Sequence, residues 1–281
     1  MAKYIDSGSG QADQDVGHWL DANIVAGIQE FRCQFGYFRY SAIEPFADVI
    51  RDLADAGGQV HFVLGSNFGS LVAADAQRVL RVAAGAHASL SIVGFADAEF
   101  HPKTVHIVRA DDSVTAVVGS SNLTGRGLGQ NVEAGVVFDS RTADTADQLE
   151  RIRDAIDRWR ELRCNAAEHP QAAQAVFPIT SDDDLRELAK RGIINLPQPR
   201  RPRPGGAGGV GGGGNQLPRR PPTWRPNRRG WRPEIPDLIP VPPNPDEPEG
   251  GELPPGSTAP TLGIPAAPAP PGGTQPTGSR T

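Results

Sequence analysis

Residues 100–133 read FHPKTVHIVRADDSVTAVVGSSNLTGRGLGQNVE and contain three pairs of polar residues, with one residue between the members of each pair. The pairs are His101 with Lys103, Ser120 with Asn122, and Asn131 with Glu133. In an extended chain, residues two apart point to the same face of a sheet. If the three segments are neighbouring strands or strand ends, all six side chains converge. That set suits a phosphodiester, because imidazole can attack phosphorus while the other groups bind its oxygens.

The order of these residues resembles a known family. His101-x-Lys103, followed by a Gly-Ser-x-Asn sequence that ends at Asn122, is similar to the HKD motif of the phospholipase D superfamily. Taken alone, His-x-Lys is typical of a solvated strand face and Gly-Ser-Ser-Asn is typical of a turn. Together and in this order they favour a catalytic site. The resemblance is general over residues 16–163 and sharpest over residues 100–138.

Two acidic residues show how far the resemblance extends. Glu133 stands eleven residues after Asn122, where the single-motif bacterial nucleases of this family carry a carboxylate. Eight residues separate Lys103 from Asp112, whereas four separate the corresponding residues of the family. No family role is therefore assigned to Asp112.

The resemblance implies a metal-free reaction without a cofactor. His101 is the expected nucleophile and forms a phosphohistidine, and Glu133 is expected to hold its imidazole in the reactive tautomer. Asn131 either binds phosphate or completes a turn. No carboxylate cluster of the kind that holds Mg²⁺ surrounds the motif, so no metal site is expected. The groups expected to stabilise charge on phosphorus are Lys103, Ser120 and Asn122.

The number of motifs bears on assembly. Enzymes of the family use two His-x-Lys sets, of which one attacks phosphorus and the other protonates the leaving oxygen. This chain carries one set. The resemblance therefore implies a homodimer with a composite site on its two-fold axis.

Hydrophobic periodicity predicts an α/β fold with a mixed, mostly parallel sheet flanked by helices. Strands are expected at residues 31–38, 59–64, 88–93, 104–109, 113–118 and 132–138. Helices are expected at residues 16–28, from 41 or 44 to 53, 70–84, 142–163 and 181–194, with a turn or short helix at 123–128. The runs on either side of Asp111 and Asp112 predict an antiparallel hairpin.

A change in composition at Pro197 separates a globular part from a tail. Residues 197–281 contain 23 of the 27 prolines and 16 of the 33 glycines. Such a segment buries too little apolar surface to offset its ordering entropy. The expected organisation is a flexible N-terminus (1–15), a catalytic domain (16–165), a short helical extension (166–196) and a disordered Pro/Gly/Arg-rich tail (197–281).

The tail is basic, although the rest of the chain is acidic. Residues 1–196 carry a net charge of −9 and residues 197–281 carry +4. Arginine contacts phosphates and tryptophan stacks on bases, so the tail indicates nucleic-acid binding to DNA or RNA. The alternatives are a Pro-rich linker whose arginines maintain solubility, or a segment that binds a protein partner. The residues expected to bind nucleic acid are Arg219, Arg220, Trp224, Arg225, Arg228, Arg229, Trp231 and Arg232.

The location of the protein is predicted from its cysteines and apolar runs. Cys33 and Cys164 do not make a disulfide framework, and Cys33 is expected to be buried in a strand. The first twenty residues lack the apolar core of a secretory signal, and no apolar run approaches the length of a membrane span. The sequence therefore predicts a cytoplasmic protein without stable membrane association.

Three functions remain open from sequence. The expected one is a metal-independent phosphodiesterase that acts as a nuclease through a phosphohistidine. A phospholipid-cleaving or phosphatidyl-transferring enzyme is disfavoured by the single motif and the acidic body. A non-catalytic nucleic-acid binding module that keeps the fold is disfavoured by the complete set of site residues.

Overall fold

A computed structural model describes residues 2–142, 145–161 and 175–196, and every structural statement below refers to these residues. The predicted tail at residues 197–281, with its arginines and tryptophans, lies outside them. Cys164 also lies outside them.

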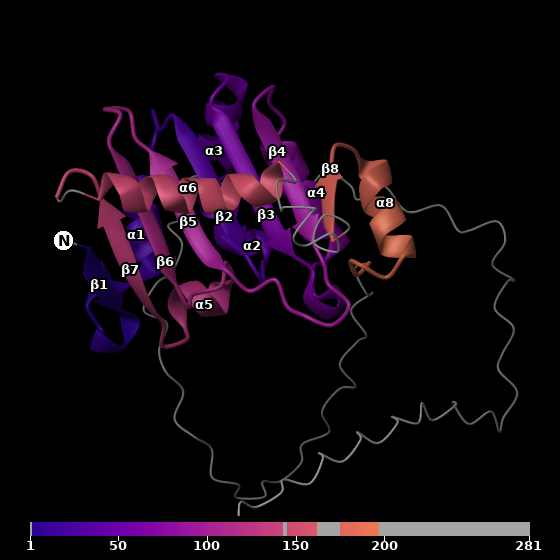
Figure 1. The fold of residues 1–281 in the computed structure, drawn as a ribbon, viewed down its shortest axis with the longest axis horizontal. Coiled ribbons are helices and arrows are strands. Elements are labelled where there is room, and N and C mark those ends of the chain that lie inside the picture. The colour runs from indigo at the N-terminus through magenta and orange to yellow at the C-terminus, as the bar shows by residue number, and fades with distance from the viewer. Residues whose placement is uncertain (1, 143–144, 162–174, 197–281) are drawn as a thin grey trace, which may run out of the picture. The chain divides into compact units, whose positions relative to one another are not determined.

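The described strands form one eight-stranded sheet in the order β1-β7-β6-β5-β2-β3-β4-β8 (Figure 1). They are β1 (Lys3–Asp6), β2 (Glu30–Phe35), β3 (Gln59–Gly65), β4 (Ala88–Val93), β5 (Lys103–Val108), β6 (Val114–Gly119), β7 (Ala134–Asp139) and β8 (Val176–Ile179). The predicted mixed α/β sheet is confirmed. Parallel pairing is confined to β2, β3 and β4, and the other neighbouring strands pair antiparallel. The prediction that the sheet is mostly parallel was therefore wrong. Short connections such as the β5–β6 hairpin can join only antiparallel strands.

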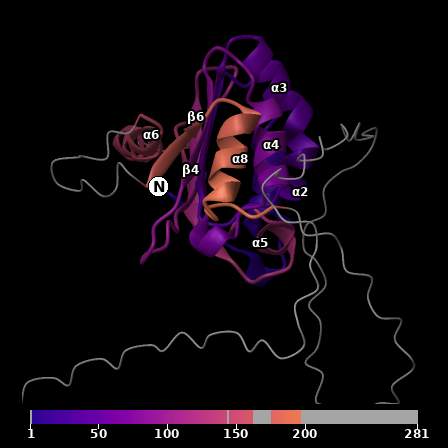
Figure 2. The same cartoon turned by 90° about the vertical axis from the view of Figure 1, so that its right-hand side faces the viewer.

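Helices cover both faces of the sheet. They are α1 (Val16–Asn23), α2 (Tyr40–Ile43), α3 (Ala47–Asp55), α4 (Ala73–Val82), α5 (Gly125–Gly129), α6 (Ala146–Arg160) and α8 (Asp182–Lys190). Figure 2 shows α6 on one face and α2, α3 and α4 on the other. The sheet is therefore the middle layer of three.

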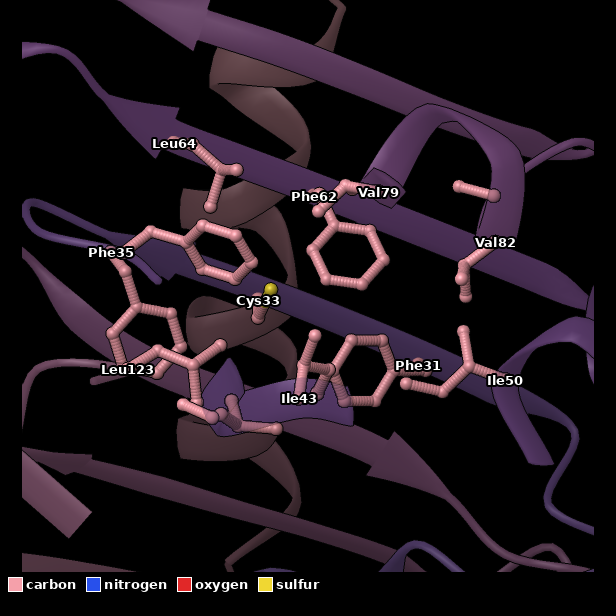
Figure 3. Packing of buried hydrophobic residues seen from close by; sticks show 14 of the residues in the cluster. Phe31, Cys33, Phe35, Ile43, Ile50, Phe62, Leu64, Val79, Val82 and Leu123 are labelled. Carbon is pink, nitrogen blue, oxygen red and sulfur yellow. The ribbon is translucent and has the colours of Figure 1, made fainter. Parts of the chain in front are cut away.

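The larger hydrophobic core lies between the sheet and the helices α3 and α4. Phe31, Cys33 and Phe35 alternate along β2 and are buried on this face (Figure 3). The ring of Phe31 lies 5.3 Å from that of Phe62 on the neighbouring strand. Burying each of these aromatic side chains contributes about 1.5–3 kcal/mol. The prediction that Cys33 is buried in a strand is confirmed.

The face of the central strands beneath α6 carries buried polar residues beside a smaller apolar cluster. The residues that we call the polar layer are buried there: Arg32, Gln34, His61, Thr104 and His106. The Arg32 Nε donates to Asp157 of α6 at 3.2 Å. This ion pair fixes one end of α6 to the middle of the sheet.

The apolar residues of α6 hold it against the sheet and against the segment before β5. Ile156 is fully buried, and Trp159 packs edge-on against Phe100 with ring centroids 5.0 Å apart. The expected helix at residues 142–163 is confirmed, and it packs on its own sheet. Because Phe100 directly precedes His101, α6 also anchors the segment that carries the histidine.

The N-terminal segment differs from the flexible one expected for residues 1–15. Lys3–Asp6 forms β1, which pairs with β7 at the edge of the sheet. Ile5 is buried there, and the Ser7 N–H donates to the Glu133 carbonyl at 3.0 Å. One apolar residue was too weak a signal to predict this strand, which forms because an existing strand offers free backbone groups.

The end of the described chain adds a strand that the sequence did not predict. Val176–Ile179 forms β8 and pairs with β4, and α8 follows it. The predicted helix is confirmed together with its cap, because Ser181 and Asp184 bond reciprocally to each other's backbone N–H groups. The segment therefore extends the sheet as well as contributing a helix.

Candidate functional site

The three polar pairs lie at the same end of neighbouring strands of the sheet. Lys103 begins β5 opposite Phe35 at the end of β2, and Thr104 lies opposite Val118 of β6. The start of β7 lies beside the end of β6. Strand ends from β2, β5, β6 and β7 therefore meet here, and Figure 1 shows α5 at the same end of the strands.

His101 and Lys103 contact each other directly. The Lys103 Nζ lies 2.9 Å from His101 Nδ1 and donates to the His101 carbonyl oxygen at 2.9 Å. The His101 side chain is 52% exposed, whereas Lys103 is 9% exposed as a residue. Burial lowers the pKa of Lys103, and the negative charges of Glu133 and Glu99 oppose that effect. The amine is thus held at a fixed place beside the imidazole.

This contact determines which ring nitrogen of His101 carries the proton. A charged Lys103 can only donate, so Nδ1 accepts and the proton of a neutral ring resides on Nε2. Nε2 lies 3.7 Å from a carboxylate oxygen of Glu99. This neutral ring is not acidic enough to protonate a leaving oxygen, a role that needs an imidazolium protonated on both nitrogens. Attack on phosphorus from Nε2 requires that this nitrogen first lose its proton.

Ser120, Asn131 and Glu133 form a second group. The Ser120 hydroxyl donates to one carboxylate oxygen of Glu133, and Asn131 Nδ2 donates to the other at 2.9 Å. The Ser7 hydroxyl accepts from the Glu133 N–H at 2.9 Å. The N-terminal segment therefore helps to position this carboxylate.

The contacts of Glu133 correct one expectation. Glu133 was expected to orient the imidazole of His101, but its carboxylate is bound by Ser120 and Asn131. The reason is the ladder between β6 and β7, which the bond from the Ser120 N–H to the Ala134 carbonyl (2.9 Å) extends by one residue. Glu133 acts on the His101 side of the site through its charge on Lys103.

Asn122 lies against α5. Its Oδ1 is buried and has no hydrogen-bond partner within the described residues. A Cβ atom on Gly127 would lie 2.2 Å from the Asn122 carbonyl oxygen, so only glycine permits this packing. The amide of Asn122 therefore retains an unused acceptor near the ends of the strands.

Asn67 is a site-supporting residue that sequence reasoning missed. It lies in the segment Gly65-Ser66-Asn67, at the end of β3. Asn67 is 1% exposed, and its amide donates to the carbonyls of Gly36 (3.1 Å) and Phe100 (3.0 Å) and accepts from the Phe100 N–H (2.9 Å). It therefore ties together the loops that follow β2 and precede His101. The echo of the Gly-Ser-x-Asn motif was the available signal.

Glu99 and Tyr37 were also missed. Glu99 is the carboxylate nearest to His101 Nε2 among the described ion pairs, and the Tyr37 ring packs edge-on against the imidazole at 5.7 Å. Burial raises the pKa of Tyr37, and the charge of Glu99 adds to that effect. Glu99 stands two residues before His101, the same spacing as in the three polar pairs, and this was the available signal. Tyr37 stands at no regular spacing from the motif.

Asp112, to which no family role was assigned, and His106 both lie outside the site. Asp112 is in the β5–β6 turn with φ of 61°, and its carboxylate accepts from the Gln29 side chain at 2.8 Å. His106 is buried in β5, where burial and then the charge of Arg32 lower its pKa to about 4. Neither lies at the edge where β5 begins.

Possible metal ligands and membrane segments were sought in the same ranges. Across residues 2–142, 145–161 and 175–196, no three His, Cys, Asp or Glu side chains gather into a group that could hold a metal ion. Within those ranges, every helix is too short or too polar to cross a bilayer.

The geometry agrees with a family match. Residues 24–156 match the family model described as "Cardiolipin synthase, PLD-like domain". This segment is a phospholipase D-like domain. It contains the three polar pairs and the strands β2 to β7 that position them. A search of curated proteins found no match.

Several solved structures are similar to this chain. Nuc, a phospholipase D family member from Salmonella typhimurium, is 18% identical, with a TM-score of 0.36 over 55% of this chain and 92% of that one. Polyphosphate kinase from Porphyromonas gingivalis is 14% identical (TM-score 0.37; 56% and 26% covered). Phosphatidylserine synthase from Haemophilus influenzae Rd KW20 is 12% identical (TM-score 0.40; 68% and 44% covered). The chain thus spans less than half of the latter two proteins.

Proposed function

We propose that this chain is a metal-independent phosphodiesterase that cleaves nucleic acid through a phosphohistidine. The observation that carries the proposal is the grouping of His101 and Lys103 with the Ser120–Asn131–Glu133 cluster at one end of the strands. An imidazole, a buried amine and neutral donors in one place match the needs of a phosphoryl centre. The match to a phospholipase D-like domain supports the same chemistry.

The proposed reaction has two steps. The Nε2 of one His101 attacks phosphorus and forms a P–N bond while the P–O bond to the leaving group breaks. A second, protonated imidazole donates its Nε2 proton to the leaving oxygen. Water then attacks phosphorus and gives a proton to that second imidazole, while the P–N bond breaks and a phosphomonoester is released. Lys103 and the nearby hydroxyl and amides bind the non-bridging oxygens in both steps.

Nucleic acid is proposed as the substrate because of the tail sequence. Nine arginines between residues 200 and 232 occur without an acidic residue, and Trp224 and Trp231 lie among them. Arginine binds phosphates and tryptophan stacks on bases. The basic stretch would draw a polyanion to a body whose net charge is negative.

A substrate panel tests the proposal. The purified protein is incubated in EDTA with single-stranded DNA, duplex DNA, RNA and a phospholipid vesicle, beside His101→Ala and the matched control His87→Ala. His87 is exposed just before β4 and stands apart from the grouped residues. We expect nucleic acid to be cleaved by the wild type and His87→Ala. His101→Ala should be inactive, and Lys103→Ala should lose about 100- to 1,000-fold in kcat.

The other outcomes are equally specific. Cleavage of the phospholipid alone would assign the domain to lipid chemistry. Nucleic-acid binding without turnover would make it a binding module. Undiminished cleavage by His101→Ala, or complete loss of activity in EDTA, would refute the mechanism.

A further inference from the structure

Phe68 combines two unusual features. Its side chain is 75% exposed, the highest value among the large hydrophobic residues that the structure describes. Its backbone is left-handed, with φ of 50° and ψ of 37°. Residues other than Gly, Asn and Asp rarely adopt this conformation, because the Cβ atom crowds the following carbonyl oxygen.

Neither feature has a reason within the fold. The turn itself would be less strained with glycine, which stands at the next position, Gly69, with φ of 69°. An exposed ring contributes little packing to the core. Strained residues that persist are characteristic of functional sites, so an exposed aromatic on strained backbone points to a ligand.

The position of Phe68 relates it to the proposed nucleophile. Asn67, the preceding residue, makes two hydrogen bonds with the backbone of Phe100, and Phe100 directly precedes His101. The loop that carries Phe68 follows β3, whose end pairs in parallel with the end of β2. Phe68 is therefore attached, through one buried amide, to the segment that carries His101.

A cation lies beside the same loop. Arg39 NH1 donates to the Ser70 carbonyl and to the Phe38 carbonyl, each at 2.9 Å. Its side chain is 47% exposed. The loop that is bonded to the segment before His101 therefore carries an exposed ring and contacts a guanidinium, whose Nε lies 4.0 Å from the Asp75 carboxylate. Rings and guanidinium groups together bind the bases and phosphates of single strands.

We propose that Phe68 stacks on an unpaired base next to the scissile phosphate, so that the site prefers single-stranded nucleic acid. The proposal rests on the proposed function and names its substrate class. In a duplex, both faces of each base are covered by neighbouring base pairs. A stacking residue therefore favours single strands, loops and frayed ends.

Small chromogenic diesters test the stacking directly. The substrates are the p-nitrophenyl esters of thymidine 5′-phosphate and thymidine 3′-phosphate, with methyl p-nitrophenyl phosphate as the baseless reference. Full-length wild type, Phe68→Ala, Phe68→Trp and the control Val25→Ala are compared. Val25 is also apolar and exposed, but it lies in the loop before β2, at the opposite end of the strands.

The readout is the ratio of kcat/KM for a base-bearing diester to that for the baseless one. For at least one of the two isomers, Phe68→Ala should lower this ratio about 5- to 150-fold, the range found when a base-stacking aromatic is truncated. Phe68→Trp should keep the wild-type ratio, and so should Val25→Ala. The ratio of single-stranded to duplex DNA cleavage should fall in Phe68→Ala as well.

Binding separates failure of this inference from failure of the proposed function. In the His101→Ala background, anisotropy titrations compare oligothymidylate with an abasic oligomer of equal length. Loss of the preference for bases in Phe68→Ala supports stacking even if no substrate is cleaved. Equal ratios and equal binding in wild type and Phe68→Ala would overturn the proposal. A loss of dimers in Phe68→Ala by light scattering would overturn it too, because the ring would then belong to a subunit contact.

Discussion

At the scale of single residues, the site depends on an amide that takes no part in the proposed chemistry. Asn67→Ala would leave the carbonyls of Gly36 and Phe100 and the N–H of Phe100 without their buried partner. Each such group costs about 1–3 kcal/mol when it is left unsatisfied. We expect the free energy of unfolding to fall by about 2–4 kcal/mol, measured by urea denaturation, and kcat to fall because His101 loses its anchor.

A matched control separates this effect from the loss of an amide in general. Gln11→Ala removes an exposed amide in the N-terminal segment and should change neither quantity. If Asn67→Ala keeps both the wild-type stability and kcat, the loops are held by other contacts. Phe100 and its packing on Trp159 would then be the remaining anchor.

The difference between found and missed residues is physical. His101, Lys103, Ser120 and Glu133 lie at strand ends, where alternate residues share a face, so spacing alone groups them. Asn67 reaches the site through side-chain hydrogen bonds to backbone atoms of two other loops. Such contacts depend on how the loops fold back, which leaves no period in the sequence. The contact between Glu133 and Ser120 was not predicted for the same reason, because it follows from the register in which β6 and β7 pair.

At the scale of elements, the polar layer under α6 makes the fold sensitive to acid. Burial, followed by the charges of Arg160 and Arg32, lowers the pKa of His61 to about 3. Burial and the charge of Arg32 lower that of His106 to about 4. In the unfolded chain both pKa values lie near 6.5. Both histidines are therefore neutral in the folded protein at pH values where they are charged in the unfolded chain.

The sign of the effect follows from proton binding. Between pH 6.5 and the folded pKa values, the unfolded chain binds protons that the folded chain does not. The free energy of unfolding therefore falls as the pH decreases, by up to about 1.4 kcal/mol per pH unit for each histidine. Urea denaturation at pH 7, 6 and 5 measures this slope. His106→Gln should make it shallower and the exposed His87→Gln should not, whereas equal slopes in all three proteins would contradict the assignment.

The elements that the sequence predicted are those with a strong period. The apolar residues of α6 recur every three or four positions, and three buried apolar residues of β2 stand at alternate positions, so both elements were predicted. β1 has one buried apolar residue, and β8 contains a proline, which is unfavourable in most strands. Both join the sheet because β7 and β4 offer unpaired backbone groups, which is a property of the sheet rather than of either segment.

At the scale of the whole molecule, the tail is expected to provide salt-sensitive affinity. Truncation after Leu196 removes the nine arginines and leaves the net negative body. Each phosphate contact made by a cation releases counterions, so the intact protein should lose affinity for long DNA steeply with salt. The truncated form should bind more weakly and with a shallower slope, measured by anisotropy. Equal slopes would remove the tail from the binding argument.

Assembly is the remaining question at this scale, and the number of imidazoles that the reaction needs bears on it. The reaction needs one imidazole that attacks phosphorus and one that protonates the leaving oxygen. One imidazole cannot be the unprotonated attacker and the protonated donor at the same time. No second His-x-Lys sequence exists in the chain to supply the other ring. A second copy of the chain would supply it on a two-fold axis.

We therefore expect an active homodimer with one composite site that contains His101 of both subunits. Wild-type chains mixed and exchanged with an excess of His101→Ala chains should lose more activity than dilution accounts for, because each mixed dimer holds one reactive imidazole. With a wild-type fraction f, activity should follow f² rather than f. Light scattering should report a dimer at the concentrations assayed, and His87→Ala chains in the same mixture should give no loss. Activity in proportion to f, or a fully active monomer, would require Glu99 or water to protonate the leaving oxygen within one chain.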